Sequence, residues 1–252
     1  MPVCHASSQP AFPARRVALA AKAACAALCL LAAAAWAQDE GVPAFKTIDS
    51  IEARTQGCVT CHGQDGQGTA DGYFPRIAGK PARYLKNQLV AFRDGTRKYA
   101  PMNYLIAYLP DSYLGEIADY FAKQRPAFTP RATPRVDAAT MARGQTIATV
   151  GDADRRIPPC MACHGAGLTG MQPGIPGLVG LSPAYVVAQL TRWRLGDRHA
   201  AEPDCMKRIA TRLSEGDVAA VAAWLSMQPP PVDASPESSN LVRMPLSCGS
   251  QQ

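Results

Sequence analysis

A five-residue run that occurs twice constrains this chain of 252 residues more than any other feature. The first copy, Cys58–His62, reads CVTCH, and the second, Cys160–His164, reads CMACH. A C-x-x-C-H run is typical of covalent haem c attachment, in which both thiols form thioethers with the porphyrin and the histidine binds iron. Zinc ribbons instead place two CxxC pairs about 15–20 residues apart, whereas these lie 102 positions apart.

The motifs therefore predict two haem c groups. The expected attachment residues are Cys58, Cys61, Cys160 and Cys163, and the expected histidine ligands of iron are His62 and His164. A thioredoxin-like redox CxxC would need strands alternating with helices around it, and the sequence shows no such pattern.

Residues 1–37 have the pattern of a secretory signal peptide. Three cations, Arg15, Arg16 and Lys22, precede an apolar run over residues 23–35, and Ala35-Trp36-Ala37 matches a cleavage site. The apolar run is too short to span a bilayer comfortably. We expect a mature chain of residues 38–252 located in the periplasm, because bacteria attach haem c after export; that reason is a property of c-type cytochromes and not of the spacing.

The charge does not indicate a nucleic-acid partner. The formal net charge of +6 loses three cations and no acid with the signal peptide, which leaves +3. Two haems would add roughly four propionates, so the complete protein would be close to neutral.

Two of the nine cysteines remain unassigned. Three lie in the signal peptide and four belong to the haem motifs, which leaves Cys205 and Cys248. An even number of spare cysteines in an exported protein predicts a disulfide. The alternative is that Cys205 binds iron as a thiolate.

The two halves of the chain repeat one another. The segment Pro75–Gly79 corresponds to Pro176–Gly180 at an offset of 101 positions, and the offset grows to 104 in the last helix of each half. Matched pairs at the offset of 101 are Tyr84 and Tyr185, Gln88 and Gln189, and Arg97 and Arg198.

Helical spacing of apolar residues predicts an all-α fold, with no alternating strand pattern. We expect helices over 82–93 and 111–124, matching helices in the second half, and shorter helices near 47–55 and 138–150. The expected boundaries are a signal peptide 1–37, an N-terminal domain 38–125, a stiff Pro-containing linker 126–137, a C-terminal domain 138–228 and a Pro/Ser-rich tail 229–252.

The sixth iron ligand determines what each haem can do. A Met ligand raises the reduction potential and fills the iron, which favours electron transfer. Met102 and Met206, both expected in loops, lie 104 positions apart, the offset of the helix that follows them. His199 and Cys205 are alternatives to Met206 at the second iron.

The chain resembles the cytochrome c4 family, dihaem proteins made of two tandem class I cytochrome c domains. The residues that carry this resemblance are both CxxCH runs, Pro-x-[Ile/Leu]-x-Gly, Tyr-[Leu/Val]-x-x-Gln-Leu, the Gly-x-Arg turns, Met102 and Met206. The resemblance implies that backbone carbonyls of Pro75 and Pro176 hold the two histidines. It also implies that the haems face each other, with propionates near the interface between domains.

We therefore expect a periplasmic dihaem electron carrier. It would move electrons from a respiratory dehydrogenase or quinol-oxidising complex to a terminal oxidase or reductase, and peripheral association with a membrane complex stays open. The alternative hypothesis is a haem enzyme, or the haem subunit of a sulfur-compound dehydrogenase, with catalysis at the second haem.

Overall fold

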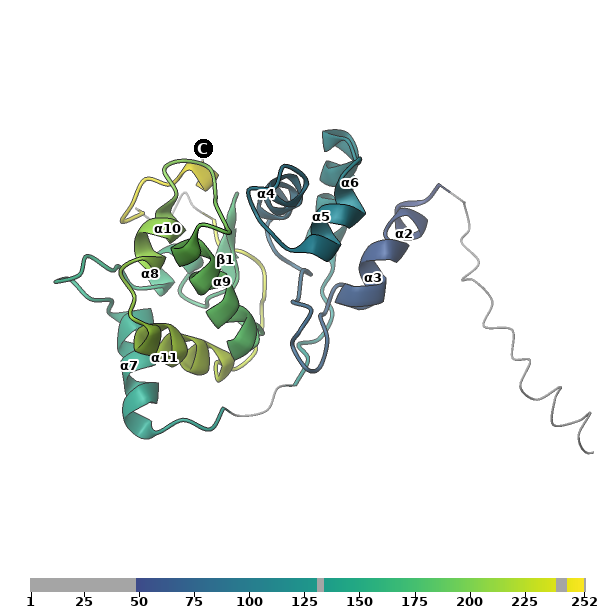
Figure 1. The fold of residues 1–252 in the computed structure, drawn as a ribbon. Helices are drawn as coiled ribbons and strands as arrows, with labels where there is room; N and C mark the ends of the chain where they lie inside the picture. Colours follow the sequence, from purple (N-terminus) through teal and green to yellow (C-terminus); the bar gives the residue numbers. More distant parts are fainter. Residues whose placement is uncertain (1–48, 131–133, 239–243, 252) are drawn as a thin grey trace, which may run out of the picture. The chain divides into compact units, whose positions relative to one another are not determined.

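Helices joined by long loops make up most of the chain in the computed structural model, which describes residues 49–130, 134–238 and 244–251 (Figure 1). The first repeat contains α2 (Ile51–Arg54), α3 (Gln56–His62), α4 (Ala82–Arg93), α5 (Ala100–Ile106) and α6 (Asp111–Lys123). The second contains α7 (Ala138–Thr149), α8 (Met161–His164), β1 (Gly170–Met171), β2 (Ile175–Pro176), α9 (Pro183–Leu195), α10 (Cys205–Ala210) and α11 (Glu215–Ser226), followed by a 3₁₀ turn, η2 (Gly249–Gln251). The predicted signal peptide lies outside the described residues.

The core of the first repeat lies between α4 and α6. Leu85 of α4 packs with Ile117 and Phe121 of α6, and these side chains recur at the spacing of one helical face. Farther along α4, Phe92 packs with Leu114 and with residues around α5. The same two helices therefore form one wall of the space beside α3.

The core of the second repeat depends on close contact between α7 and α11. A Cβ atom at Gly144 of α7 would lie 2.1 Å from the carbonyl oxygen of Ala220 in α11, so the glycine lets the two backbones approach. The start of α11 is fixed by a capping box, in which the Ser214 side chain accepts from the Asp217 backbone and the Asp217 side chain accepts from the Ser214 backbone. Most residues of α11 are buried, among them Val218, Val221 and Leu225.

The all-α expectation is confirmed, with three differences in detail. Within the range of the helix expected near 47–55, the described residues form the short helix α2, and after Thr55 a separate helix, α3, carries the first motif. The loop after the second motif contains a two-residue antiparallel ribbon in which Gly170 pairs with Pro176 and Met171 with Ile175. The third difference concerns the two candidate methionines and is described with the site.

The segments predicted as linker and tail are held by specific contacts. In the described part of 126–137, Arg76 donates to the carbonyls of Pro126 (2.7 Å) and Ala127 (3.0 Å), and its guanidinium stacks on Phe128. In the tail, the Glu237 backbone bonds with Gly170, in a bridge beside β1. The described residues belong to one compact unit that starts at Thr47.

Candidate functional site

The first CxxCH motif forms the last turns of α3, which places its cysteines and its histidine beside one cavity. The His62 side chain is buried, and its Nδ1 lies 2.9 Å from the Pro75 carbonyl oxygen. A carbonyl only accepts, so Nδ1 carries the proton and Nε2 keeps a free lone pair. The α3 helix ends immediately afterwards at Gly63, whose φ of 82° favours glycine.

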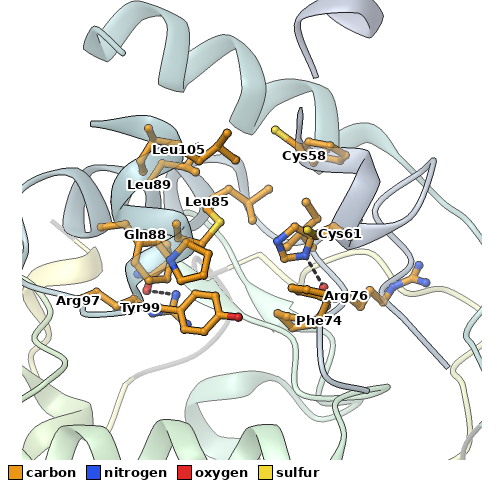
Figure 2. A pocket seen from close by; sticks show the side chains of 18 of the residues that line it. Cys58, Cys61, Phe74, Arg76, Leu85, Gln88, Leu89, Arg97, Tyr99 and Leu105 are labelled. Atoms are coloured by element: carbon orange, nitrogen blue, oxygen red, sulfur yellow. Dashed lines mark hydrogen bonds between the residues drawn. The ribbon is translucent and has the colours of Figure 1, made fainter. Parts of the chain in front are cut away.

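A cavity of about 1040 Å³ lies against this histidine. Its size is at the upper end of the usual range for ligand sites, about 300–1,000 Å³. Figure 2 shows Cys58 and Cys61 on one side of it and Leu85, Leu89 and Leu105 on the other. The cavity is also lined by Met102, so the residues predicted for the first haem all border one largely apolar space.

The second motif repeats the geometry of the histidine, with Cys160 as the N-cap of α8. The His164 side chain is buried, and its Nδ1 lies 2.8 Å from the carbonyl oxygen of Pro176. Cys163 is also buried, while Cys160 is partly buried against the main core cluster of the second repeat. Both histidines are thus oriented by the proline carbonyl twelve or thirteen residues after them.

Burial disfavours the charged forms of both histidines and of the Cys58, Cys160 and Cys163 thiols. It lowers the pKa of His164 to about 4, with a smaller contribution from the positive charge of Lys80, and it also lowers the pKa of His62. Burial raises the pKa of the Cys58 and Cys160 thiols to about 11. The described residues contain no cluster of three acidic, His or Cys side chains arranged to hold a metal ion.

The two candidate methionines lie on short helices, which corrects the expectation that they lie in loops. Met102 is in α5 and Met206 is in α10. The sequence contained a reason for this: Pro101 suits the first turn of a helix, and the Asp204 side chain caps α10 by accepting from the Lys207 backbone at 3.0 Å. Both methionines are partly buried, and Met206 packs against the same core cluster as Cys160.

The two alternatives to Met206 have other partners in the structure. His199 has its Nε2 within 2.9 Å of the Gly196 carbonyl oxygen, in the turn after α9. Cys205 forms a disulfide with Cys248, which ties the first residue of α10 to the tail. A cysteine in a disulfide is not a thiolate ligand, so the main feature favouring a catalytic second haem is absent while the bond is intact.

Two buried arginines connect the repeats. Arg97 donates to Gln88 of its own repeat and to Gln189 and Tyr185 of the other. Arg198, at the matched position, makes the same set of bonds. It donates to Gln189 of its own repeat and to Gln88 and Tyr84 of the other. Neither guanidinium has a carboxylate within ion-pair distance among the described residues.

Two donors beside this network are left without a partner. Within the described part of the chain, Trp193 Nε1 and Arg198 Nε are buried and make no hydrogen bond. Burying such donors unpaired is costly, and uncompensated guanidinium charge next to them favours an anionic acceptor. A porphyrin that brings carboxylates to this region fits both observations, as the apolar cavity fits the ring of the first.

Some of these site residues could be predicted from sequence and others could not. The pairs Arg97 and Arg198 and Gln88 and Gln189 stand out as matched polar residues in the repeat, although sequence alone did not show that they bond across it. Lys80 has no matched lysine in the second repeat, and its partner lies 97 positions away. No pattern in the sequence indicated that contact.

The comparisons with known proteins agree with this geometry. The cytochrome c family model matches residues 52–116, within the first repeat. The thiosulfate dehydrogenase electron acceptor of Thiomonas intermedia is 37% identical over 172 residues, covering 68% of this chain and 78% of the relative. Cytochrome c4 of Pseudomonas aeruginosa is 34% identical over 176 residues, covering 69% and 85%.

Solved structures give the same result. Reduced cytochrome c4 from Pseudomonas stutzeri has a TM-score of 0.58 and 30% identity, covering 69% of this chain and 94% of that one. Thiosulfate dehydrogenase from Marichromatium purpuratum has a TM-score of 0.62 and 34% identity over 68% of this chain, which spans about a third (36%) of that longer protein. The chain therefore belongs to the cytochrome c4-type family of dihaem c-type cytochromes, which transfer electrons.

Proposed function

We propose that this protein is a periplasmic carrier that accepts electrons from a thiosulfate dehydrogenase and passes them to a terminal oxidase or reductase. The observation that carries the haem assignment is the duplicated histidine site, in which His62 and His164 are buried and each is held by a proline carbonyl beside a CxxC. When bound, haem c supplies an iron that changes between its ferric and ferrous states.

The proposed attachment residues are Cys58 and Cys61 for the first haem and Cys160 and Cys163 for the second. His62 with Met102, and His164 with Met206, would be the axial ligands. The Pro75 and Pro176 carbonyls keep each imidazole in one tautomer and one orientation, as groups around metal ligands commonly do. The aliphatic side chains of α4 and α6 exclude water from the first site, which keeps reorganisation small when charge moves.

The polar network at the repeat interface would receive the carboxylates of the haems. Arg97 and Arg198 supply buried positive charge, and Trp193 Nε1 and Arg198 Nε supply unpaired donors. Fixed donors in a low-dielectric site bind an anion more strongly than donors in water. The network would therefore hold both haems close to the same surface, where electrons can pass between them.

Thiosulfate dehydrogenase is the proposed donor because two curated relatives are named as its electron acceptor. The similar solved thiosulfate dehydrogenase also contains a region of this fold within its own chain. Export to the periplasm is proposed from the signal pattern in residues 1–37. The helices in the described part of the chain include none with the length and hydropathy of a membrane span.

The first site has an exposed aromatic edge that suits a docking partner. Tyr104 is 86% exposed and Leu105 is 46% exposed, and both line the first cavity; Tyr108, at 96%, follows them on the surface. The matched residues of the second repeat are Arg208 and Arg212 for the two tyrosines. We propose that the dehydrogenase docks on this aromatic edge, because it lies where the first haem would be nearest to solvent.

Replacing each methionine tests the ligand assignment. Met102→Ala and Met206→Ala should each remove one share of the weak near-infrared band of methionine-ligated ferric haem, while a His199→Ala control keeps both shares. An unchanged band in the Met206→Ala protein would show that another residue binds the second iron. Pyridine haemochrome analysis should find two covalently bound haems per chain.

Replacing one tyrosine tests the donor surface. Tyr104→Glu should lower the second-order rate of reduction by thiosulfate dehydrogenase about tenfold, because an aromatic side chain at an interface is often among its strongest contacts. The matched control is Arg208→Glu on α10, which should leave that rate unchanged. Equal effects of the two variants in stopped-flow reduction would place the docking surface elsewhere.

A further inference from the structure

One buried cation breaks the symmetry between the two repeats. Lys80 follows the Pro75–Gly79 segment and is 8% exposed, whereas the matched residue of the second repeat is Leu181, an apolar side chain of the core. Lysine is rarely buried to this extent without a partner. A function of Lys80 would therefore be specific to one of the two haem sites.

The Lys80 side chain extends from the first repeat to the histidine loop of the second. Its Nζ donates to the carbonyl oxygen of Gly177 at 2.7 Å. Gly177 directly follows Pro176, the residue whose carbonyl holds His164 at 2.8 Å. Lys80 also lines the first cavity. Lys80 is thus bonded to the segment that orients His164, and it also borders the cavity of the first site.

No described carboxylate lies within ion-pair distance of the Lys80 ammonium group. Besides burial, Tyr185 raises the pKa of Lys80 and the positive charge of Arg76 lowers it. Burial lowers the pKa of Lys80 to about 8, so the side chain is still mainly charged at pH 7. Its charge is therefore not cancelled locally by the protein.

We propose that Lys80 makes the two haems unequal, by raising the reduction potential of the second haem more than that of the first. A fixed positive charge favours the ferrous state of an iron near it because that state carries one positive charge fewer than the ferric state. Electrons that enter at the first site then come to rest at the second. This inference rests on the proposed haem assignment, with His164 as a ligand.

Redox titration of the complete dihaem protein at pH 7 tests this role. Lys80→Met removes the charge and the donor, whereas Lys80→Gln removes the charge and keeps a donor for the Gly177 carbonyl. The matched control is Lys123→Met, which removes the same charge from the exposed end of α6, where solvent screens it. Met102→His and Met206→His identify the two couples, since histidine in place of methionine lowers the potential of the haem it binds.

We expect both Lys80 variants to weaken the electron affinity of the second haem about tenfold relative to the first. For a one-electron couple this corresponds to a fall of about 59 mV in the difference between the two potentials. The Lys123 variant should leave that difference unchanged. A lysine that acted only through its hydrogen bond would give a shift in Lys80→Met and not in Lys80→Gln, so a shift in both variants identifies the charge.

Three results would overturn the inference. The first couple could fall as much as the second in both Lys80 variants. Lys80→Gln could match the unmodified protein while Lys80→Met shifts, which would assign the effect to the hydrogen bond and not to the charge. A protein with two covalent haems and no differential shift would refute the role of Lys80 alone, whereas fewer than two haems would refute the proposed haem assignment as well.

Discussion

The disulfide between Cys205 and Cys248 should control how firmly the second methionine is held. Its sulfur atoms join residues 43 positions apart, and Met206 is the next residue after one of them. In the chain-entropy description, closing a loop of this length stabilises the folded protein by about 4 kcal/mol. The bond also fixes the start of α10, so its removal should loosen the methionine as well as lower the free energy of unfolding.

A double variant, Cys205→Ser with Cys248→Ser, is the appropriate perturbation because it leaves no free thiol that can itself bind iron. Guanidinium unfolding followed by circular dichroism should give a free energy lower by about 4 kcal/mol. On heating, the near-infrared band of the ferric protein should lose the share of the second haem well before that of the first. Met102 has no disulfide beside it, so the first site serves as an internal control.

Two outcomes would refute this reasoning about the disulfide. An unchanged unfolding midpoint would show that the tail contributes nothing to stability, contrary to the loop-closure argument. Loss of both shares of the band at the same temperature would show that the bond does not act on Met206 in particular. The single variant Cys248→Ser separates the effect of the tether from that of a new ligand, since it alone frees the Cys205 thiol.

Two further predictions concern the second repeat. Gly144→Ala should destabilise the protein by about 2 kcal/mol in thermal unfolding, because the new methyl group meets the backbone of α11. The control is Gly115→Ala, where a Cβ meets nothing within 4 Å, and this variant should be neutral or stabilising. Equal losses of stability in the two variants would refute the packing argument. Burial raises the pKa of Asp217, but hydrogen bonds from Arg155 and others outweigh it and lower the pKa overall, and Arg155 also lowers the pKa of Asp152 to about 2. A carboxylate whose pKa is lowered by folding stabilises the protein fully above its unfolded pKa near 4, and this effect is lost as the pH falls through the folded pKa. Asp217→Asn should therefore lower the denaturant midpoint, and this loss should become smaller between pH 4 and 2. A loss that stays constant over that range would contradict the argument.

The sequence was most informative where covalent chemistry fixes the spacing of residues. The CxxCH motifs follow from the distance between two vinyl groups and one iron, so their positions could be read without any knowledge of packing. The repeat then predicted the matched helices, because equal spacing of apolar residues builds equal helical faces.

The rest depended on contacts between segments far apart in the chain. The short gap between the expected helices predicts loops at Met102 and Met206, whereas Pro101 and Asp204 in fact lie at the start of a short helix at each position. The bond from Lys80 to the Gly177 carbonyl was not predictable, since a lysine in sequence gives no sign of burial and a backbone acceptor gives no sign at all.

The crossed bonds of Arg97 and Arg198 have a consequence for how this molecule can be divided. Each glutamine, Gln88 and Gln189, accepts from the arginine of its own half and from that of the other. A half produced by itself would lose two of the acceptors of its guanidinium. It would also lose the other half, which now covers that guanidinium, and the arginine would be exposed to solvent. Shortening the gene to a single-haem version should therefore yield an insoluble or unstable fragment, and lineages that keep one half are expected to have replaced the arginine first.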